Sequence, residues 1–521
     1  MSMVAAQLKK ISPGTAANES SKNKYEPRAS KELVIAFCGA LGSGIADVVR
    51  IFSEELKAAD YEVVSIKVSN LIKGAIAAGL SKANIDESTR EKYYESLQSA
   101  GNNLRKDCGT EVLSQLVVQE IAKNRTKQIP EGIGIEAHVP KRLVYLVDQL
   151  KHPDEVVLLR TIYGNLFYLV GVLSLHDVRR MRLVDEGISP ANAETAMERD
   201  RKEPVSHGQQ LEKTLHRADF FTRHNKANQE QLRESLKRFI ALLHGVNGIT
   251  PTKVEYGMFV AFSAAMKSAC LSRQVGAAIQ DDSGRIIATG TNDVPRFGGG
   301  LYGPDHAVDD RCVHGGICHN DKHKKKLIAQ IRALLGKQPN AADATKTALT
   351  ADAIESVSNE IYESTRIGDL IEFSRAVHAE MDALISLARG GIGSTVGATL
   401  YTTTFPCHSC ARHIVAAGIS AIYYIEPYEK SLAKELHGDA ITLDCSDLKK
   451  DADKVQFIQF EGIAPRLYRR AFNVTSERKD SSGKALRVPA NQLAQVTPEY
   501  LDNYRQMESK VVQHLADLKQ T

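Results

Sequence analysis

The chain has 521 residues and a formal net charge of +4; 43% of the residues are hydrophobic, 6% are aromatic and none is Trp. This length predicts more than one domain, with enough apolar residues for sizeable cores. A nearly balanced charge and few aromatic rings argue against a dedicated nucleic-acid-binding protein, which is usually more basic and offers rings for base stacking.

The N-terminal region and the cysteines bear on the cellular compartment. Residues 1–30 are rich in Ser, Asn, Lys and Ala, lack the apolar core of a signal peptide and are expected to form a flexible tail. The longest apolar run, 166–173, is too short to cross a bilayer. Eight cysteines in so long a chain suit a reducing compartment better than a disulfide framework. We therefore expect a cytoplasmic protein without a membrane segment.

Residues 32–50 have the layout of a phosphate-binding loop: an apolar strand, a Gly-rich turn and a helix. The candidate nucleotide-binding residues of the turn are Gly39, Gly42, Ser43 and Gly44. Ile45 and Ala46 stand where such a loop carries its lysine and its Mg²⁺-binding Ser or Thr. Backbone N–H groups can still bind a phosphate, whereas phosphoryl transfer loses its main charge stabilisation.

The segments that follow this loop extend the pattern. Residues 143–148 and 166–173 are predicted to be buried strands, and residues 229–243 are predicted to form a closing helix. This order resembles P-loop nucleotide kinases. It implies an α/β domain over 31–245, with a parallel sheet and flanking helices, that is inactive as a kinase and binds a regulatory nucleotide. The alternative is a relic domain that serves only as a packing or assembly surface.

Residues 266–295 begin a second region. They are predicted to form a helix, a strand over 275–280, a turn at 281–284 and a second strand over 285–289. Arg273, just before the first strand, is a candidate phosphate contact, and a surface arginine is the alternative. Residues 321–326 form a basic cluster that is expected to be a solvated helix face, or less often a phosphate contact.

A group of Cys and His residues lies around residues 302–326. Together with one cysteine from the preceding helix, a second, closed zinc site could draw on Cys270, Cys312, Cys318, His306 and His323. Their spacing is not that of a standard zinc finger. Free buried thiols and surface histidines are therefore the alternative.

The most specific motif pairs His378 and Glu380 with Cys407 and Cys410. His-x-Glu followed by Pro-Cys-x-x-Cys is the general signature of zinc-dependent nucleobase deaminases. His378, Cys407 and Cys410 would fill three corners of a tetrahedral Zn²⁺ site and leave the fourth to water, as in catalytic zinc sites. Glu380 would then be free to transfer protons. A closed zinc ribbon with a fourth protein ligand is the alternative.

The local sequence places these residues at the starts of helices. Apolar positions after His378 recur with helical spacing, and Gly390 and Gly391 end the helix. A second helix beginning at Pro406 would present both sulfurs on one face. Residues 398–404, between the two helices, are predicted to form a strand.

Residues 254–428 resemble the deoxycytidylate deaminase family, on the strength of the zinc motif and of the stretch 371–384. The resemblance implies a cytidine-deaminase-like, three-layer α/β/α domain over 250–475. In that family the Asn of a Gly-x-Asn turn holds the sugar, and the matching residue here is Asn292. Phage-type members carry a structural zinc, and Cys270 matches one of its ligand positions.

The chain as a whole resembles bacterial anti-phage deoxycytidine nucleotide deaminases, with residues 476–521 as a helical extension. The resemblance implies deamination of dCTP or dCMP, depletion of the nucleotide pool during phage infection, inhibition by a small RNA, and a homo-oligomer. Two other classes compete with this hypothesis. A polynucleotide deaminase should show a basic or aromatic groove, and a non-enzymatic nucleotide sensor would have no need of Glu380.

Overall fold

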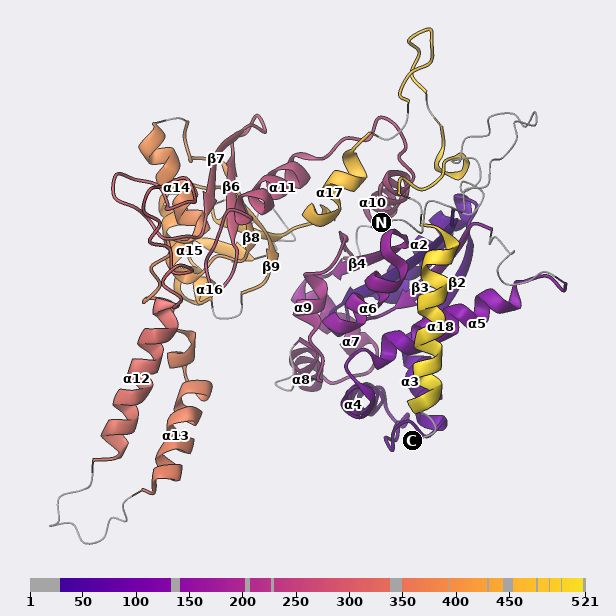
Figure 1. The fold of residues 1–521 in the computed structure, drawn as a ribbon, viewed down its shortest axis with the longest axis horizontal. Helices are drawn as coiled ribbons and strands as arrows, with labels where there is room; N and C mark the ends of the chain where they lie inside the picture. The colour runs from indigo at the N-terminus through magenta and orange to yellow at the C-terminus, as the bar shows by residue number, and fades with distance from the viewer. Residues whose placement is uncertain are drawn as a thin grey trace, which may run out of the picture. The chain divides into compact units, whose positions relative to one another are not determined.

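The computed structural model describes residues 29–132, 141–201, 207–225, 229–337, 349–391, 393–428, 431–443, 453–474, 477–486, 488–497 and 499–518. The chain forms two compact units (Figure 1). Unit 1 comprises residues 1–249 and 473–521, and unit 2 comprises residues 250–472. Nearly all of the expected flexible tail lies outside the described residues. No helix among the described residues combines the length and apolar character needed to cross a membrane.

Unit 1 is built on a parallel sheet. Its strands are β1 (Glu32–Gly39), β2 (Glu62–Lys67), β3 (Leu143–Asp148), β4 (Phe167–Leu173) and β5 (Phe220–Arg223), in the order β5-β4-β1-β3-β2. Every residue of β1 and β4 is buried. Continuous apolar runs of this kind are typical of parallel strands covered on both faces, which explains why the sequence predicted β3 and β4 to within one residue.

Helices flank this sheet. They are α2 (Ile45–Ala58), α3 (Val68–Ala77), α4 (Arg90–Cys108), α5 (Val112–Lys127), α6 (Pro153–Tyr163), α7 (His176–Asp185), α8 (Pro190–Arg201), α9 (Leu211–Leu215), α10 (Gln229–Leu243) and α18 (Leu501–Leu518), with the short turns η2 (Gly164–Leu166) and η4 (Ala490–Gln492). α18 packs against α5 and α6. The predicted C-terminal extension is therefore part of unit 1.

Unit 2 contains a mixed sheet. Its strands are β6 (Gly276–Gln280), β7 (Ile286–Thr291), β8 (Thr399–Thr404), β9 (Ala421–Glu426), β10 (Ile441–Leu443) and β11 (Val455–Gln459), in the order β10-β11-β9-β8-β6-β7. β6 is antiparallel to both β7 and β8, whereas β8, β9, β11 and β10 run parallel. β8 lies between β9 and β6, and the segment that follows it carries the cysteine motif. The motif therefore lies at the carboxyl end of a central strand.

Unit 2 also contains helices. They are α11 (Lys253–Ala265), α12 (His319–Leu335), α13 (Ala351–Ser364), α14 (Ala379–Gly390), α15 (His408–Ala416), α16 (Ala433–His437) and α17 (Pro465–Phe472), with η3 (Arg366–Asp369) and the two-residue β12 (Gly462–Ile463). Gly276 faces α11 and Gly290 faces α14. Because these glycines stand at adjacent, opposite-facing positions of the β6–β7 pair, α11 and α14 cover opposite faces. α12 and α13 pack on each other and extend away from the sheet (Figure 1).

Candidate active site

The starts of α14 and α15 position the residues of the deaminase motif. His378 is the N-cap of α14, and Glu380 lies in its first turn. Cys407 is the N-cap of α15, which begins at His408, two residues later than the predicted start at Pro406. The Cys407 Sγ accepts a hydrogen bond of 3.4 Å from the Cys410 N–H. Both helix N-termini, with their partial positive charge, therefore favour thiolate and carboxylate forms at this point of the sheet.

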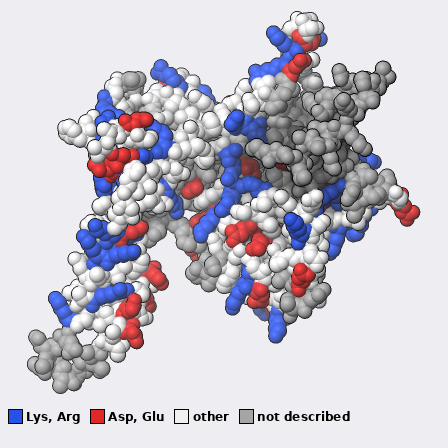
Figure 2. All heavy atoms as spheres, in the orientation of Figure 1, with Lys and Arg blue, Asp and Glu red and all other residues white. Residues whose placement is uncertain are grey.

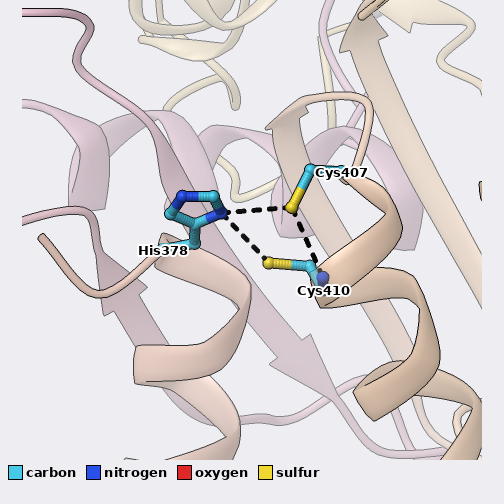
Figure 3. A group of neighbouring side chains, drawn as sticks. All are labelled: His378, Cys407 and Cys410. Carbon is cyan, nitrogen blue, oxygen red and sulfur yellow. Dashed lines mark hydrogen bonds between the residues drawn. The ribbon is translucent and has the colours of Figure 1, made fainter. Parts of the chain in front are cut away.

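The three predicted metal ligands lie together (Figure 3). His378 Nδ1 is 3.3 Å from the Sγ of Cys407 and 3.3 Å from the Sγ of Cys410. The ligand atoms of these three side chains all lie within 4.8 Å of one another. Among the described residues, no other group of three or more His, Cys, Asp or Glu side chains meets this condition. An imidazole and two thiols are zinc ligands, and three of them leave one position of a tetrahedron open.

The protonation of this trio depends on its internal hydrogen bonds. Hydrogen bonds with Cys410 and with His378 lower the pKa of Cys407 to about 4. The bond to Cys407 raises the pKa of His378 to about 9, and the bond to Cys407 together with burial raises the pKa of Cys410. Protons on His378 and Cys410 must therefore leave when a metal ion binds, so metal affinity should fall in acid.

Glu380 lies next to the trio without belonging to it. The side chain is buried, and its Oε2 accepts a hydrogen bond of 3.5 Å from Cys410 Sγ. Burial raises the pKa of this carboxyl group. A carboxyl with a raised pKa beside a reaction centre is suited to accept and return a proton near neutral pH.

A cavity of about 320 Å³ opens beside these residues. His378, Glu380 and Cys407 line it, together with Asn292 and Arg273. The structure thus brings both predicted substrate-binding residues to the same cavity as the metal ligands. Such a concave site with a few converging polar groups is the usual form of a small-molecule site.

Comparison with known proteins identifies the family of unit 2. Residues 251–426 match the model of the cytidine and deoxycytidylate deaminase zinc-binding region. The deoxycytidylate deaminase of Enterobacteria phage T4 is 33% identical over 172 residues, which cover 33% of this chain and 77% of the phage protein. The chain belongs to the deoxycytidylate deaminase family.

More distant deoxycytidylate deaminases are also similar to this chain. The enzyme of Saccharomyces cerevisiae is 28% identical over 179 residues, which cover 34% of this chain and 39% of the yeast protein. The crystal structure of the dCMP deaminase of cyanophage S-TIM5 with dCMP and dUMP covers 40% of this chain and 98% of its own, at 19% identity. Its TM-score of 0.22 is too low for a structural argument.

Asn292 has a defined structural role in this deaminase unit. Its Oδ1 accepts a hydrogen bond of 2.7 Å from the Val275 N–H, and its Nδ2 donates one of 2.8 Å to the Arg273 carbonyl oxygen. The amide therefore fixes the backbone of the segment that carries Arg273. Sugar binding by Asn292 remains a prediction.

The cavity also contains residues that the sequence did not single out. Lys324, Arg375, Phe405 and Tyr428 line it, and the Arg273 guanidinium lies 5.9 Å from the ring centre of Tyr428. Lys324 is only 9% exposed and its Nζ donates to the Gly368 carbonyl oxygen, although its cluster was expected to be a solvated face. Lys322, Lys325 and Lys326 are exposed, and Figure 2 shows basic side chains on the surface in the region of α12. Helical spacing alone could have separated the inward lysine from its outward neighbours.

The predicted second zinc ligands are not gathered as a metal site among the described residues. Cys270, Cys312 and Cys318 line the same cavity as the catalytic motif. His306 Nδ1 instead contacts the backbone of Gly303, and His323 stacks on Phe373 with ring centres 5.3 Å apart. A second zinc in this deoxycytidylate deaminase therefore remains a prediction.

The candidate phosphate-binding loop joins β1 to α2 in unit 1. Gly42 and Gly44 have positive φ angles of 78° and 76°, which favour glycine. The Leu41 N–H donates a hydrogen bond of 2.7 Å to Oδ2 of the fully buried Asp200. Ser43 Oγ is buried and has no hydrogen-bond partner within the described part of the chain. One backbone donor of the loop is thus already taken by an internal carboxylate.

Proposed function

We propose that unit 2 catalyses the zinc-dependent hydrolytic deamination of a free deoxycytidine nucleotide, dCMP or dCTP, to the corresponding deoxyuridine nucleotide. The observation that supports this most is the grouping of His378, Cys407 and Cys410 beside Glu380, in a member of the deoxycytidylate deaminase family. Zinc fits the donor set, because two thiols and an imidazole are ligands that zinc prefers.

Glu380 is the proton carrier of the proposed reaction. A bound Zn²⁺ supplies Lewis acidity and lowers the pKa of water. Glu380 accepts a proton from the attacking water and delivers it to the ring nitrogen beside the attacked carbon. It then takes the second proton of that water from the new hydroxyl group on this carbon and gives it to the amino group, which leaves as ammonia as the C–N bond breaks and the carbonyl forms. Its burial excludes bulk water and raises its pKa, which holds that proton at the carboxyl between the transfers.

The other side chains of the cavity suit the rest of a nucleotide. We propose that Arg273, Lys324 and Arg375, which line the cavity, contact phosphate groups. Cations of this kind bind phosphate through charge-assisted hydrogen bonds. Phe405 and Tyr428 offer aromatic faces to the base. Asn292, which lines the same cavity, is proposed to hold the sugar.

The biological setting is proposed from the resemblance of the whole chain. It comprises depletion of deoxycytidine nucleotides during phage infection, a homo-oligomeric assembly, inhibition by a small RNA and a regulatory nucleotide at the loop of unit 1. A phosphate at that loop would have to compete with Asp200 for the Leu41 N–H.

The substrate is tested by incubating the full-length protein with cytidine, dCMP, dCTP and a cytosine-containing single strand. The proposal expects uracil from dCMP or dCTP and little from the other two. Conversion of the single strand alone would favour a polynucleotide deaminase instead. No conversion of any of them by zinc-loaded protein would reject deamination of cytosine.

Replacement of Glu380 separates proton transfer from metal binding. Glu380→Ala should lower the deamination rate on the order of 10²- to 10⁴-fold or more while leaving zinc bound, because a group that only transfers protons is lost. Metal analysis and ammonia release measure the two effects. Cys407→Ala should lose both metal and activity. A Glu380→Ala enzyme with the wild-type rate would contradict the mechanism.

The same metal analysis decides whether a second zinc exists. If Cys270, Cys312 and Cys318 with a nearby histidine hold a structural ion, wild-type protein should carry two zinc ions per chain, and Cys318→Ser should carry one. A wild-type value of one zinc ion per chain rejects the second site.

A further inference from the structure

A second cavity lies within unit 1, at the carboxyl ends of adjacent parallel strands. Its wall includes Leu41, which follows β1, and Asp148, Gln149 and Lys151, which end and follow β3. β1 and β3 are neighbours in the sheet. The chain leaves β1 through α2 and returns as β2, on the far side of β3. It leaves β3 through α6 and returns as β4, on the far side of β1. Crevices at such a reversal of strand order are where open α/β sheets bind their ligands.

Most of the remaining wall is apolar, with one aromatic ring. Val68, Ile72, Leu97 and Leu113 line the cavity with Tyr94. The volume is about 100 Å³, on a measure by which one water needs about 10 to 15 Å³. The cavity therefore has room for one small ring rather than for a few isolated waters.

The wall also includes the side-chain amide of Gln98, whose hydrogen-bonding capacity is not used by the described residues. Gln98 comes from α4 and is 6% exposed. Among the residues that the structure describes, neither its Nε2 nor its Oε1 has a hydrogen-bond partner. A buried amide without partners costs free energy, and such groups in native structures call for an explanation. An amide presents a donor and an acceptor side by side, which is the pattern that pairs with the edge of a base.

Gln149 adds a sign of strain at the same place. Its φ is 76°, a conformation that is uncommon for a residue other than glycine. Its Nε2 donates a hydrogen bond of 3.1 Å to the Gly39 carbonyl oxygen, which joins the segment after β3 to the end of β1. Strained residues that the surrounding structure holds in place are concentrated at binding sites.

The cations around this cavity already have carboxylate partners. The Arg105 guanidinium pairs with Glu155 at 2.8 Å, and Lys151 Nζ pairs with Asp200. Asp200 also holds the Leu41 N–H. A phosphate in this cavity would meet cations that are already paired with carboxylates, and it would also lie near the carboxyl group of Asp148. The site thus favours an uncharged ring over an anion.

We propose that this cavity of unit 1 binds the base of a nucleoside, with the Gln98 amide hydrogen-bonding the edge of the base and Tyr94 and the aliphatic wall contacting its faces. The site is separate from the proposed deamination and does not depend on it. Either donor–acceptor arrangement of a base edge can be matched by the amide, since its two ends can exchange by rotation.

The proposal is tested by calorimetric titration of the full-length protein with adenosine, guanosine, cytidine and uridine, and with ribose 5-phosphate, which has no base. At least one nucleoside should bind, and ribose 5-phosphate should bind at least tenfold more weakly. Gln98→Met should weaken nucleoside binding roughly tenfold to a hundredfold, because the hydrogen bonds of a buried base edge are lost. The thermal midpoint of Gln98→Met should be equal to or above that of the wild type, since an unpartnered amide is removed.

Gln115→Met is the matched control. Gln115 is 5% exposed and does not line the cavity. Its Oε1 has no hydrogen-bond partner in the described ranges of the chain. This variant should bind nucleosides like the wild type. The proposal is overturned if no nucleoside binds at millimolar concentration, if Gln98→Met binds as well as the wild type, if Gln115→Met weakens binding equally, or if ribose 5-phosphate binds as tightly as the nucleosides.

Discussion

The placement of Glu380 depends on a single glycine in the sheet. A Cβ atom on Gly290 of β7 would lie 2.0 Å from the Ala379 carbonyl oxygen and 2.4 Å from the Ala383 nitrogen, both backbone atoms of α14. Next to this contact, the Asp382 carboxylate accepts a hydrogen bond of 3.0 Å from the Thr291 N–H. Together these contacts hold the first turn of α14 directly against β7, and this turn carries Glu380, the proposed proton carrier.

Gly290→Ala should therefore displace α14. Because backbone atoms cannot rotate away, we expect a loss of unfolding free energy of about 1 to 3 kcal/mol. A displacement of about 1 Å at the reacting groups can lower the rate on the order of 10²-fold. Denaturant unfolding and deamination kinetics measure the two losses. Gly315→Ala is the control, since the nearest atom to its Cβ would be 3.8 Å away. Equal behaviour of the two variants would show that the close packing has no role.

The candidate site was predictable where its residues are close in sequence. His378 and Glu380 are two positions apart, Cys407 and Cys410 are three, and their chemistry is specific. Gly290 is different: an isolated glycine in a strand indicates a close approach of some backbone, but not of which one. Lys324 lies in a run of lysines. Helical spacing could have separated it from its outward neighbours, but its acceptor, the Gly368 carbonyl oxygen, is known only from the packing of α12.

At the scale of elements, the C-terminal helix is fixed by a buried ionic cluster. Arg125 of α5 pairs with Glu32 of β1 and with Glu508 of α18, and the Tyr504 hydroxyl donates a hydrogen bond of 2.5 Å to Glu32. The cluster places one cation against two carboxylates. Burial raises the pKa of Glu508, so this arrangement is costly without the guanidinium.

Arg125→Met should consequently destabilise unit 1 by about 3 to 5 kcal/mol at neutral pH, because two carboxylates stay buried without a counter-charge. In the folded variant, Glu508 should bind a proton at a higher pH than in the unfolded chain, because burial raises its pKa and the guanidinium is gone. The stability deficit relative to wild type should then shrink as the pH falls from 7 to 5. Denaturant unfolding at both pH values measures this change.

The exposed pair between Lys237 and Glu234 provides the control for that measurement. Their charged atoms are 2.8 Å apart, but the two side chains are 46% and 60% exposed. Lys237→Met should change stability by less than about 1 kcal/mol at either pH. A pH-independent deficit in Arg125→Met would contradict the buried-charge argument.

The sequence predicted individual strands and helices better than it predicted which elements pack against one another. The strands at 143–148 and 275–280 and the helix at 229–243 are confirmed as β3, β6 and α10, because each has a clear apolar pattern and turn residues at its ends. The C-terminal helix was expected as an extension of uncertain role. Its docking depends on Glu32 and Arg125, which lie far away in the chain and which no local pattern connects to Glu508.

At the scale of the whole molecule, the two units divide the proposed functions. Unit 2 carries the deaminase motif, and unit 1 carries a loop that keeps its glycines but lacks the lysine and the magnesium ligand at positions 45 and 46. We expect no detectable ATP-dependent phosphorylation of nucleoside monophosphates. A ligand at the loop can affect deamination only if it binds two states of the protein with different affinities. Such couplings are typically about 1 to 3 kcal/mol, or several-fold to a hundredfold in apparent affinity.

Gly44→Glu tests whether the loop regulates unit 2. A Cβ atom at Gly44 would lie 2.5 Å from the His224 ring and 3.0 Å from the Arg182 guanidinium, so the larger side chain must rearrange the loop. Deamination kinetics should change several-fold or more, although the substitution lies outside unit 2. Gly74→Glu adds the same charge to unit 1 at a helical position where a Cβ would meet no atom within 4 Å, and it should deaminate like the wild type. Thermal unfolding must show that both variants are folded. Wild-type kinetics in a folded Gly44→Glu protein would mean that the loop does not regulate deamination, and measurable kinase activity would mean that its substituted positions do not disable it.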